Sequence, residues 1–391
     1  MKRNLSVLAL LLILALLAGC AAGGGSGDPT GAPEGAAIAA AAQTSGNSTE
    51  TPSATAPWTS AATSWAAQSS GEFTTTAPFT KAPWTNAVTS RAAQTTTPSV
   101  EKTPMVYFTS DISPKGLMAV YEALGAAPKG NIAIKVSTGE PPNSNYLRAE
   151  LIGDFARFLD GTFVENNTAY GGSRSSDAAH LQVAKDHGFA DMTPKGFDLL
   201  DAGKNSLSLP VVGGEILKEN FVGAHFANYD YYVVLSHFKG HAMGGYGGAI
   251  KNISIGLASK QGKCWIHTGG KSKLIMLGLN QNNFLKSMAE AGKSVVDSLD
   301  GNILFINVMN RLSVDCDCVG SPAEPDMHDI GILASFDPVA VDKACVDLVR
   351  ADPEGASLMK RIDSKNGTLA YIHGAKIGLG SLDYRLVNID D

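Results

Sequence analysis

Cysteine is scarce in this chain of 391 residues, which has five cysteines, at positions 20, 264, 316, 318 and 345. So few thiols in a chain of this length exclude a small fold held together by disulfides. Charged residues make up only 17% of the chain and the net charge is −6, with no basic stretch. Nucleic acid is therefore excluded as the partner. No apolar run approaches the roughly 20 residues that a membrane-spanning helix needs.

The first 20 residues have the pattern of a secretory signal. Lys2 and Arg3 precede an apolar run from Leu5 to Leu17, which is too short to span a membrane. The run ends in Leu17-Ala-Gly-Cys20, which resembles the lipobox of bacterial lipoproteins. The resemblance implies a diacylglycerol on Cys20 and cleavage just before it. Because two or three acyl chains bind a membrane firmly, we expect an extracytoplasmic protein anchored to the cell membrane. An ordinary signal peptide with a chance cysteine is the alternative.

Residues 21–103 are rich in Ala, Thr, Ser, Gly and Pro and have no periodic apolar face. Such a segment cannot offset the entropy lost on ordering, so we predict a disordered tether. A stretch that begins Ala56-Pro-Trp-Thr recurs from Ala82. Two copies are too few for a stacked repeat fold, which indicates duplication within a spacer. Docking of the repeat's tryptophans to the cell envelope is the alternative.

From residue 104 to residue 391, apolar runs alternate with amphipathic ones. The runs predicted as strands are 105–109, 131–137, 162–165, 231–235, 302–308 and 330–334. The segments predicted as helices are 114–124, 146–159, 176–187, 283–299 and 338–350. Several strands are apolar on both faces, which is typical of a parallel sheet covered by helices. We therefore predict an α/β fold with a mostly parallel sheet and flanking helices, as one large or two-lobed domain.

The densest group of chemically active side chains follows the strand at 231–235. The catalytic candidates are His237, His241 and Lys251. The predicted ligand-binding residues are Gly244, Gly245, Gly247, Gly248 and Asn252. A strand, a glycine loop and a helix in succession aim backbone N–H groups at an anion, so we predict binding of a carboxylate or phosphate. The spacings of a Walker A loop and of a dinucleotide-binding loop are both absent. A plain glycine-rich turn is the alternative.

Two cysteines one residue apart, Cys316 and Cys318, would point to the same face of an extended segment. Thiolates so placed suit a soft transition metal or an iron–sulphur cluster, whereas a disulfide between them would close a very small ring. Two thiols cannot complete a tetrahedral site, so Cys264 and His267 are candidates for further ligands. An acidic residue precedes each of the two cysteines, which should make free thiols react poorly. Inert thiols are the alternative.

Four stretches carry a resemblance to the DUF362 family, a domain of unknown function often found with iron–sulphur proteins. They are Ser236-His-Phe-Lys-Gly-His, Gly247-Gly-Ala-Ile-Lys-Asn-Ile-Ser-Ile-Gly, Asp315-Cys-Asp-Cys and Asp329-Ile-Gly-Ile-Leu-Ala-Ser-Phe-Asp-Pro-Val-Ala-Val-Asp. The resemblance extends from about residue 107 to 387 and implies a metal- or iron–sulphur-linked redox enzyme. Many relatives carry an added ferredoxin module with Cys-x-x-Cys runs. Such runs are absent from this sequence, so a cluster of that kind is not implied.

A more distant likeness is to the nickel-pincer lactate racemases. In that family a histidine, a glycine loop, a lysine and a second histidine follow one another, and His241, Gly245-Tyr-Gly-Gly, Lys251 and His267 fall in this order here. The likeness implies that His241 is an acid or base, that Lys251 tethers a cofactor and that His267 binds nickel.

Three functions remain open at this stage. The first is a membrane-anchored enzyme linked to a metal or to redox chemistry, and the second is a lipoprotein that binds a small anion without catalysis. The third is a protein that docks partners through its tryptophan repeats. Convergence of the glycine loop, His267 and the Cys-x-Cys pair on one cleft would favour the enzyme.

Overall fold

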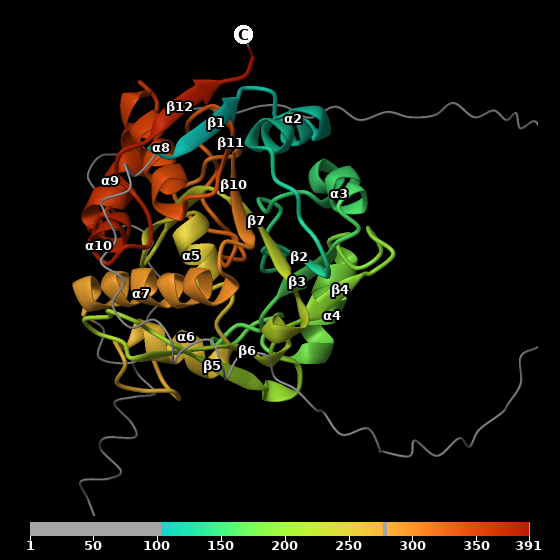
Figure 1. Cartoon of the computed structure of the whole chain (residues 1–391), viewed down its shortest axis with the longest axis vertical. Coiled ribbons are helices and arrows are strands. Elements are labelled where there is room, and N and C mark those ends of the chain that lie inside the picture. Colours follow the sequence, from blue (N-terminus) through green and yellow to red (C-terminus); the bar gives the residue numbers. More distant parts are fainter. Residues whose placement is uncertain (1–102, 277–279, 391) are drawn as a thin grey trace, which may run out of the picture. The chain divides into compact units, whose positions relative to one another are not determined.

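The central feature is an eight-stranded sheet in the order β12-β1-β11-β10-β7-β2-β3-β4 (Figure 1). Its strands are β1 (Met105–Thr109), β2 (Ile132–Lys135), β3 (Thr162–Glu165), β4 (Phe197–Leu199), β7 (Tyr231–His237), β10 (Ile303–Met309), β11 (Gly331–Ser335) and β12 (Arg385–Asn388). β11 runs antiparallel to its neighbours β1 and β10, and the other neighbouring pairs are parallel. The predicted, mostly parallel sheet is thus confirmed.

The computed structural model describes residues 103–276 and 280–390. The predicted signal segment, Cys20 and almost all of the tether lie outside these residues. Within these two ranges the helices are α2 (Pro114–Leu124), α3 (Ala149–Phe158), α4 (Asp177–Asp186), α5 (Ala249–Ser254), α6 (Lys260–His267), α7 (Gln281–Leu299), α8 (Pro338–Ala351), α9 (Ala356–Ser364) and α10 (Leu369–Lys376). The described residues fall in one compact unit, so the two-lobed alternative is not needed.

Helices cover both faces of the sheet because its central strands are apolar on both sides. Tyr231, Val233 and Leu235 of β7 pack in the cluster formed with α2 and α3. Tyr232 and Val234 point the other way, into the cluster that contains α5 and α8. Figure 1 shows α2 and α3 on one side of the strands and α8, α9 and α10 on the other. Burial of each large apolar side chain contributes roughly 1.5–3 kcal/mol, so this three-layer arrangement supplies the core.

Two helices begin at a capping side chain. The Asp337 side chain accepts hydrogen bonds from the N–H groups of Val339 and Ala340, and Pro338 occupies the first turn of α8. Ser113 caps α2 in the same way by accepting from the N–H of Gly116. Each cap satisfies N–H groups that have no partner within the helix, which fixes where these helices begin.

The segment between β7 and α5 departs from the predicted open loop. It forms a hairpin of β8 (Lys239–His241) and β9 (Gly245–Gly247). Gly240 is required there, because a Cβ at this position would lie 2.2 Å from the carbonyl oxygen of Val314. This close approach brings the hairpin against the segment that carries Cys316 and Cys318. A second hairpin, β5 (Ser206–Pro210) with β6 (Glu219–Gly223), was not predicted.

Across residues 103–276 and 280–390, no helix combines the length and the apolar character that a membrane-spanning segment requires.

Candidate functional site

A cavity of about 330 Å³ lies where β2, β3 and β7 end. Its basic side chains are Lys135, Arg174, Lys239, Lys251 and Lys263, and its carboxylates are Glu165 and Asp317. Lys135 and Glu165 are the last residues of β2 and β3, so the parallel order of the strands brings their side chains to one edge. Because basic groups outnumber carboxylates, the cavity attracts anions.

Lys251 on α5 differs from the other lysines of the cavity in its contacts. Among the residues that the structure describes, no hydrogen-bond or ion-pair partner contacts its ammonium group. Burial lowers the pKa of Lys251 to about 8, and Lys239 lowers it further while Asp317 opposes the shift. At pH 7 the group is therefore a half-buried cation without a counter-ion in contact, which is the arrangement that an anionic ligand would stabilise.

The other lysines of the cavity are held by protein oxygens. The Nζ of Lys135 donates to the carbonyl oxygen of Val136 at 2.5 Å and to Oδ1 of Asn252 at 2.9 Å. The Nζ of Lys239 lies 2.6 Å from Oδ2 of Asp317. These contacts fix the positions of both ammonium groups, so their charges contribute to the field of the cavity without being free to move.

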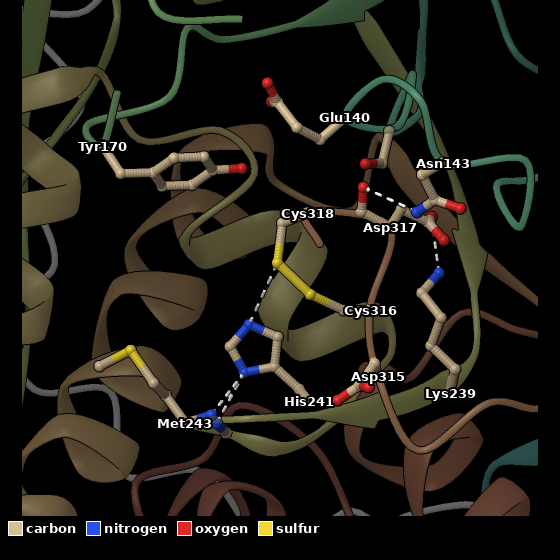
Figure 2. Close-up of a disulfide and its surroundings, with 12 residues drawn as sticks. Glu140, Asn143, Tyr170, Lys239, His241, Met243, Asp315, Cys316, Asp317 and Cys318 are labelled. Carbon is tan, nitrogen blue, oxygen red and sulfur yellow. Dashed lines mark hydrogen bonds and ion pairs between the residues drawn. A yellow bond between two sulfur atoms is a disulfide. The ribbon is translucent and has the colours of Figure 1, made fainter. Parts of the chain in front are cut away.

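His241, the last residue of β8, has a defined tautomer. Its Nδ1 accepts the backbone N–H groups of Met243 at 3.1 Å and Gly244 at 2.8 Å. Burial, together with Lys251 and His267, holds the pKa of His241 well below its usual value, so the ring is neutral at pH 7. Since Nδ1 is an acceptor, the proton of the neutral ring is on Nε2. Figure 2 shows that nitrogen facing Sγ of Cys318, at 3.9 Å.

His267, the last residue of α6, has the opposite tautomer. Its Nδ1 donates to the carbonyl oxygen of Lys263 at 2.6 Å, which leaves a lone pair on Nε2. Burial lowers the pKa of His267 to about 4, and Lys251 and Lys263 lower it while the bond to the Lys263 carbonyl opposes the shift. The cavity is therefore lined by one neutral imidazole that donates from Nε2 and one that accepts there.

The Cys-x-Cys pair lines the same cavity, and the two sulfurs are joined as a Cys316–Cys318 disulfide. The close spacing of the two cysteines had made a disulfide unfavourable, and the structure corrects this expectation. The small ring is closed here because the backbone turns at Asp317, whose carbonyl oxygen accepts from the N–H of Glu140 at 2.7 Å and from the amide of Asn143 at 3.2 Å. The extended backbone assumed from the sequence is absent at this turn.

The carboxylates beside the cysteines are both engaged by basic side chains. Oδ1 of Asp315 accepts from Arg361 at 3.0 Å. Asp317 contacts Lys239 and also Nδ1 of His237 at 3.1 Å. Burial would raise the pKa of Asp317, but Lys239 and His237 outweigh it and lower the pKa to about 2. The neighbouring acids therefore do not oppose negative charge on a sulfur atom.

The predicted metal site can be tested against these contacts. A ring nitrogen of His241 and the sulfurs of Cys316 and Cys318 lie within 4.8 Å of one another, so the three are close enough to hold one ion. Coordination through Nε2 of His241 would require its proton to move to Nδ1, at which two backbone N–H groups already point. The sulfurs would also have to be reduced. The residues present therefore fit a metal poorly in this conformation.

The profile of DUF362, described as a domain of unknown function, matches residues 132–347, which is more than half of the chain. The chain belongs to the DUF362 family. This match includes every basic and acidic residue that lines the cavity. No curated protein matches the DUF362 chain.

Two solved structures are similar to the DUF362 chain at low identity. The lactate racemase apoprotein from Thermoanaerobacterium thermosaccharolyticum is 14% identical with a TM-score of 0.40, and covers 62% of this chain and 56% of its own. A protein from Thermotoga maritima is 12% identical with a TM-score of 0.35, and covers 67% of this chain and 58% of its own. The chain thus spans less than two thirds of either structure.

The DUF362 domain brings most of the predicted site residues together. Those that line the cavity are His237, His241, Gly247, Gly248, Lys251, Asn252, His267, Cys316 and Cys318. Gly244 and Gly245 are not among the lining residues. Gly244 instead donates its N–H to His241, and Gly245 has a φ of +81° in the hairpin. Cys264 is a buried free thiol outside the lining, and burial raises its pKa, so it does not supply a further ligand.

The first two N–H groups of α5 are engaged by a carboxylate of the protein. The N–H groups of Ala249 and Ile250 donate to the carboxylate of Asp342, at 2.6 and 3.0 Å. Asn252 is also engaged, because its amide donates to the Leu235 carbonyl and its Oδ1 accepts from Lys135. Basic side chains, Lys251 among them, therefore supply positive charge to the cavity, and Gly247 and Gly248 of the predicted anion site line it.

Sequence analysis did not assign a role to Lys135, Glu165, Arg174 or Lys263. Arg174 forms ion pairs with Glu140 at 3.1 Å and Glu165 at 3.0 Å, and all three side chains are buried. A signal was present for two of the four, because Lys135 and Glu165 are charged residues that end otherwise apolar strands. A charge at the carboxyl end of a buried strand is a reason to expect a site in an α/β sheet.

Proposed function

We propose that the chain is a membrane-anchored, extracytoplasmic enzyme that binds a small anion, a carboxylate or a phosphate, in the cavity beside Lys251. The observation that carries this proposal is the ammonium group of the half-buried Lys251, which lines the cavity without an ion-pair partner in the described part of the chain. The surrounding basic side chains strengthen the attraction because the cavity is poorly solvated.

Catalysis is favoured over simple binding by the convergence on one cavity of Gly247, Gly248, Lys251, His267 and the Cys-x-Cys pair. His267 offers a lone pair on Nε2 and is suited to accept a proton from a bound substrate. His241 offers an N–H and is suited to donate a hydrogen bond or a proton. A pocket that contains an acceptor, a donor and an anion-binding cation has the parts needed for proton transfer next to a bound acid group.

A metal-linked enzyme is the second candidate. It is supported by the proximity of His241, Cys316 and Cys318, which would offer soft sulfur ligands once the disulfide is reduced. Iron–sulphur chemistry would need further ligands beyond these three. The exposed group of His328, Asp352 and Glu354 does not supply them, since it forms its own ion pairs.

Replacing Lys251 by methionine is expected to weaken binding of inorganic phosphate or succinate by roughly tenfold or more, which corresponds to the loss of one charged contact. Calorimetry on the full chain measures this change. The wild-type affinity should also fall as the pH rises above about 8, because Lys251 then loses its charge. Lys115→Met, at an exposed position on α2, is the matched control. Equal affinities for wild type and Lys251→Met would contradict the proposal.

Replacing Cys20 by serine is expected to leave the protein without its lipid, since the thiol is the acceptor in the lipobox reaction. The variant should pass from the detergent phase to the aqueous phase in a phase-partition experiment, whereas Cys264→Ala should partition as the wild type does. Unchanged partition of Cys20→Ser into detergent would show that this cysteine is not the anchor.

A further inference from the structure

We propose that Cys316 and Cys318 are a redox-active pair that exchanges two electrons with a small thiol bearing an anionic group. This inference rests on the proposed binding of anions beside Lys251, and adds the chemistry that would take place there. The sulfurs line the same cavity as Lys251 and His267, so a ligand held by the basic side chains lies in the compartment that contains the disulfide.

The two cysteines differ in exposure. Cys316 is 4% exposed, whereas Cys318 is partly exposed and faces the cavity beside His241. Cys318 is therefore the half of the disulfide that we expect an incoming thiolate to attack. Figure 2 shows the disulfide directly above the imidazole, with Cys318 as the half that points toward it.

His241 is placed to stabilise negative charge on Cys318. Two backbone N–H groups fix its Nδ1 as an acceptor, so the Nε2 proton is directed at the sulfur 3.9 Å away. A hydrogen bond from a neutral donor to an anion is stronger than one to a neutral sulfur. The arrangement thus favours release of a Cys318 thiolate more than it stabilises the disulfide.

The backbone around the pair is held by contacts that do not depend on the S–S bond. The carbonyl oxygen of Asp317 accepts two hydrogen bonds from the segment at 140–143, and its carboxylate contacts Lys239 and His237. The cysteines are separated by one residue, so closing this loop restricts the unfolded chain very little. The bond can therefore open and close without releasing the segment, as an exchange site requires.

The reaction balances as a two-electron exchange. One thiolate attacks Sγ of Cys318, the S–S bond breaks, and Cys316 leaves as a thiolate that takes a proton from solvent. A second thiolate attacks the ligand sulfur of the mixed disulfide and releases Cys318 as a thiolate beside the His241 N–H. Two thiols are oxidised to one disulfide, and the protein gains two electrons and one proton, with a second proton taken from solvent when the Cys318 thiolate is protonated. The reverse sequence reduces a small disulfide.

The test uses the full chain, oxidised in air, and three thiols that differ in charge: 3-mercaptopropionate, 2-mercaptoethanol and cysteamine. Alkylation and mass spectrometry follow the opening of the disulfide. After correction for each thiol's rate with a model disulfide, the anionic thiol should react roughly tenfold or more faster than the cationic one. Lys251→Met should abolish this preference. His241→Phe should slow the release of Cys318 roughly tenfold, and Cys264→Ala should behave as the wild type.

The outcomes separate this inference from the function proposed above. If the protein binds phosphate but its disulfide exchanges with none of the three thiols, the redox inference is overturned and the proposed anion binding stands. Exchange at equal corrected rates for all three thiols would overturn the anionic substrate class, and the proposed function with it. Stoichiometric metal in protein reduced without oxygen, lost in Cys316→Ser/Cys318→Ser, would replace the redox pair by a metal site.

Discussion

Asp342→Ala is expected to destabilise the domain by about 3–5 kcal/mol, the range for removing one partner from a buried charged network. The Asp342 carboxylate is fully buried and accepts hydrogen bonds from Ala249 N–H, Ile250 N–H and Asn307 Nδ2, the last at 2.8 Å. Alanine would leave these donors without an acceptor at the start of α5, the helix that carries Lys251. Urea unfolding of the full chain measures the loss.

Asp363→Ala on the exposed face of α9 is the control, and its effect should stay within about 0.5 kcal/mol. The pH dependence gives a second check. Burial raises the pKa of Asp342 to about 6, so the folded protein binds this proton more readily than the unfolded chain does. The stability of wild type relative to Asp342→Asn should therefore rise as the pH falls from 7 to about 4. Loss of less than about 1 kcal/mol in Asp342→Ala would contradict the role assigned to this carboxylate.

Arg174→Met should cost about 3–5 kcal/mol as well, and should also disturb the site. The Arg174 guanidinium is 2% exposed and contacts Glu140 and Glu165. Although burial would raise the pKa of Glu165, Arg174 and His180 outweigh it and hold that pKa well below its usual value. Methionine would leave two buried carboxylates without this cation. Because the N–H of Glu140 holds the turn at Asp317, we expect the disulfide to become more accessible to thiols.

The double variant Arg174→Met/Glu165→Gln tests the cause of this loss. Removing one of the two buried carboxylate charges should recover about 1–2 kcal/mol, so the two substitutions should be less than additive in urea unfolding. Additive losses would show that Arg174 acts through packing of its aliphatic stem and not through its charge.

Much of the fold could be predicted from local pattern. The boundaries of β1, β3 and α2 coincide with the predicted ones, because apolar runs and capping residues define them within the segment itself. The hairpin β8–β9 was missed because its conformation is set by a contact with Val314, which lies far away in the sequence. Nothing in the glycine-rich segment alone distinguishes a hairpin from an open loop.

The residues of the candidate site that lie close together in the sequence could be predicted from it. His237, His241 and Lys251 stand close together in the chain, and Cys316 with Cys318 forms a recognisable pair. Arg174 and Lys263 lie alone in their own segments, and only the packing of β2, β3 and β7 brings them to the same cavity. The N–H groups at the start of α5 were expected to face the ligand, because the sequence gives no sign that Asp342, more than 80 residues later, accepts hydrogen bonds from two of them.

The position of β1 in the sheet has a consequence for the rate at which the chain folds. β1 lies between β12 and β11, and Ser335 Oγ donates to the carbonyl oxygen of Met105, 230 residues earlier. β1 therefore has no partner strand until β11 and β12 have been made. The entropy cost of closing the long loop between β1 and β11 must be met before their pairing contributes any free energy. We therefore expect slow folding, with a long-lived intermediate in which the edge of β10 is exposed. If the chain is exported while it is synthesised, that edge would need protection from other chains until the C-terminal strands have been made.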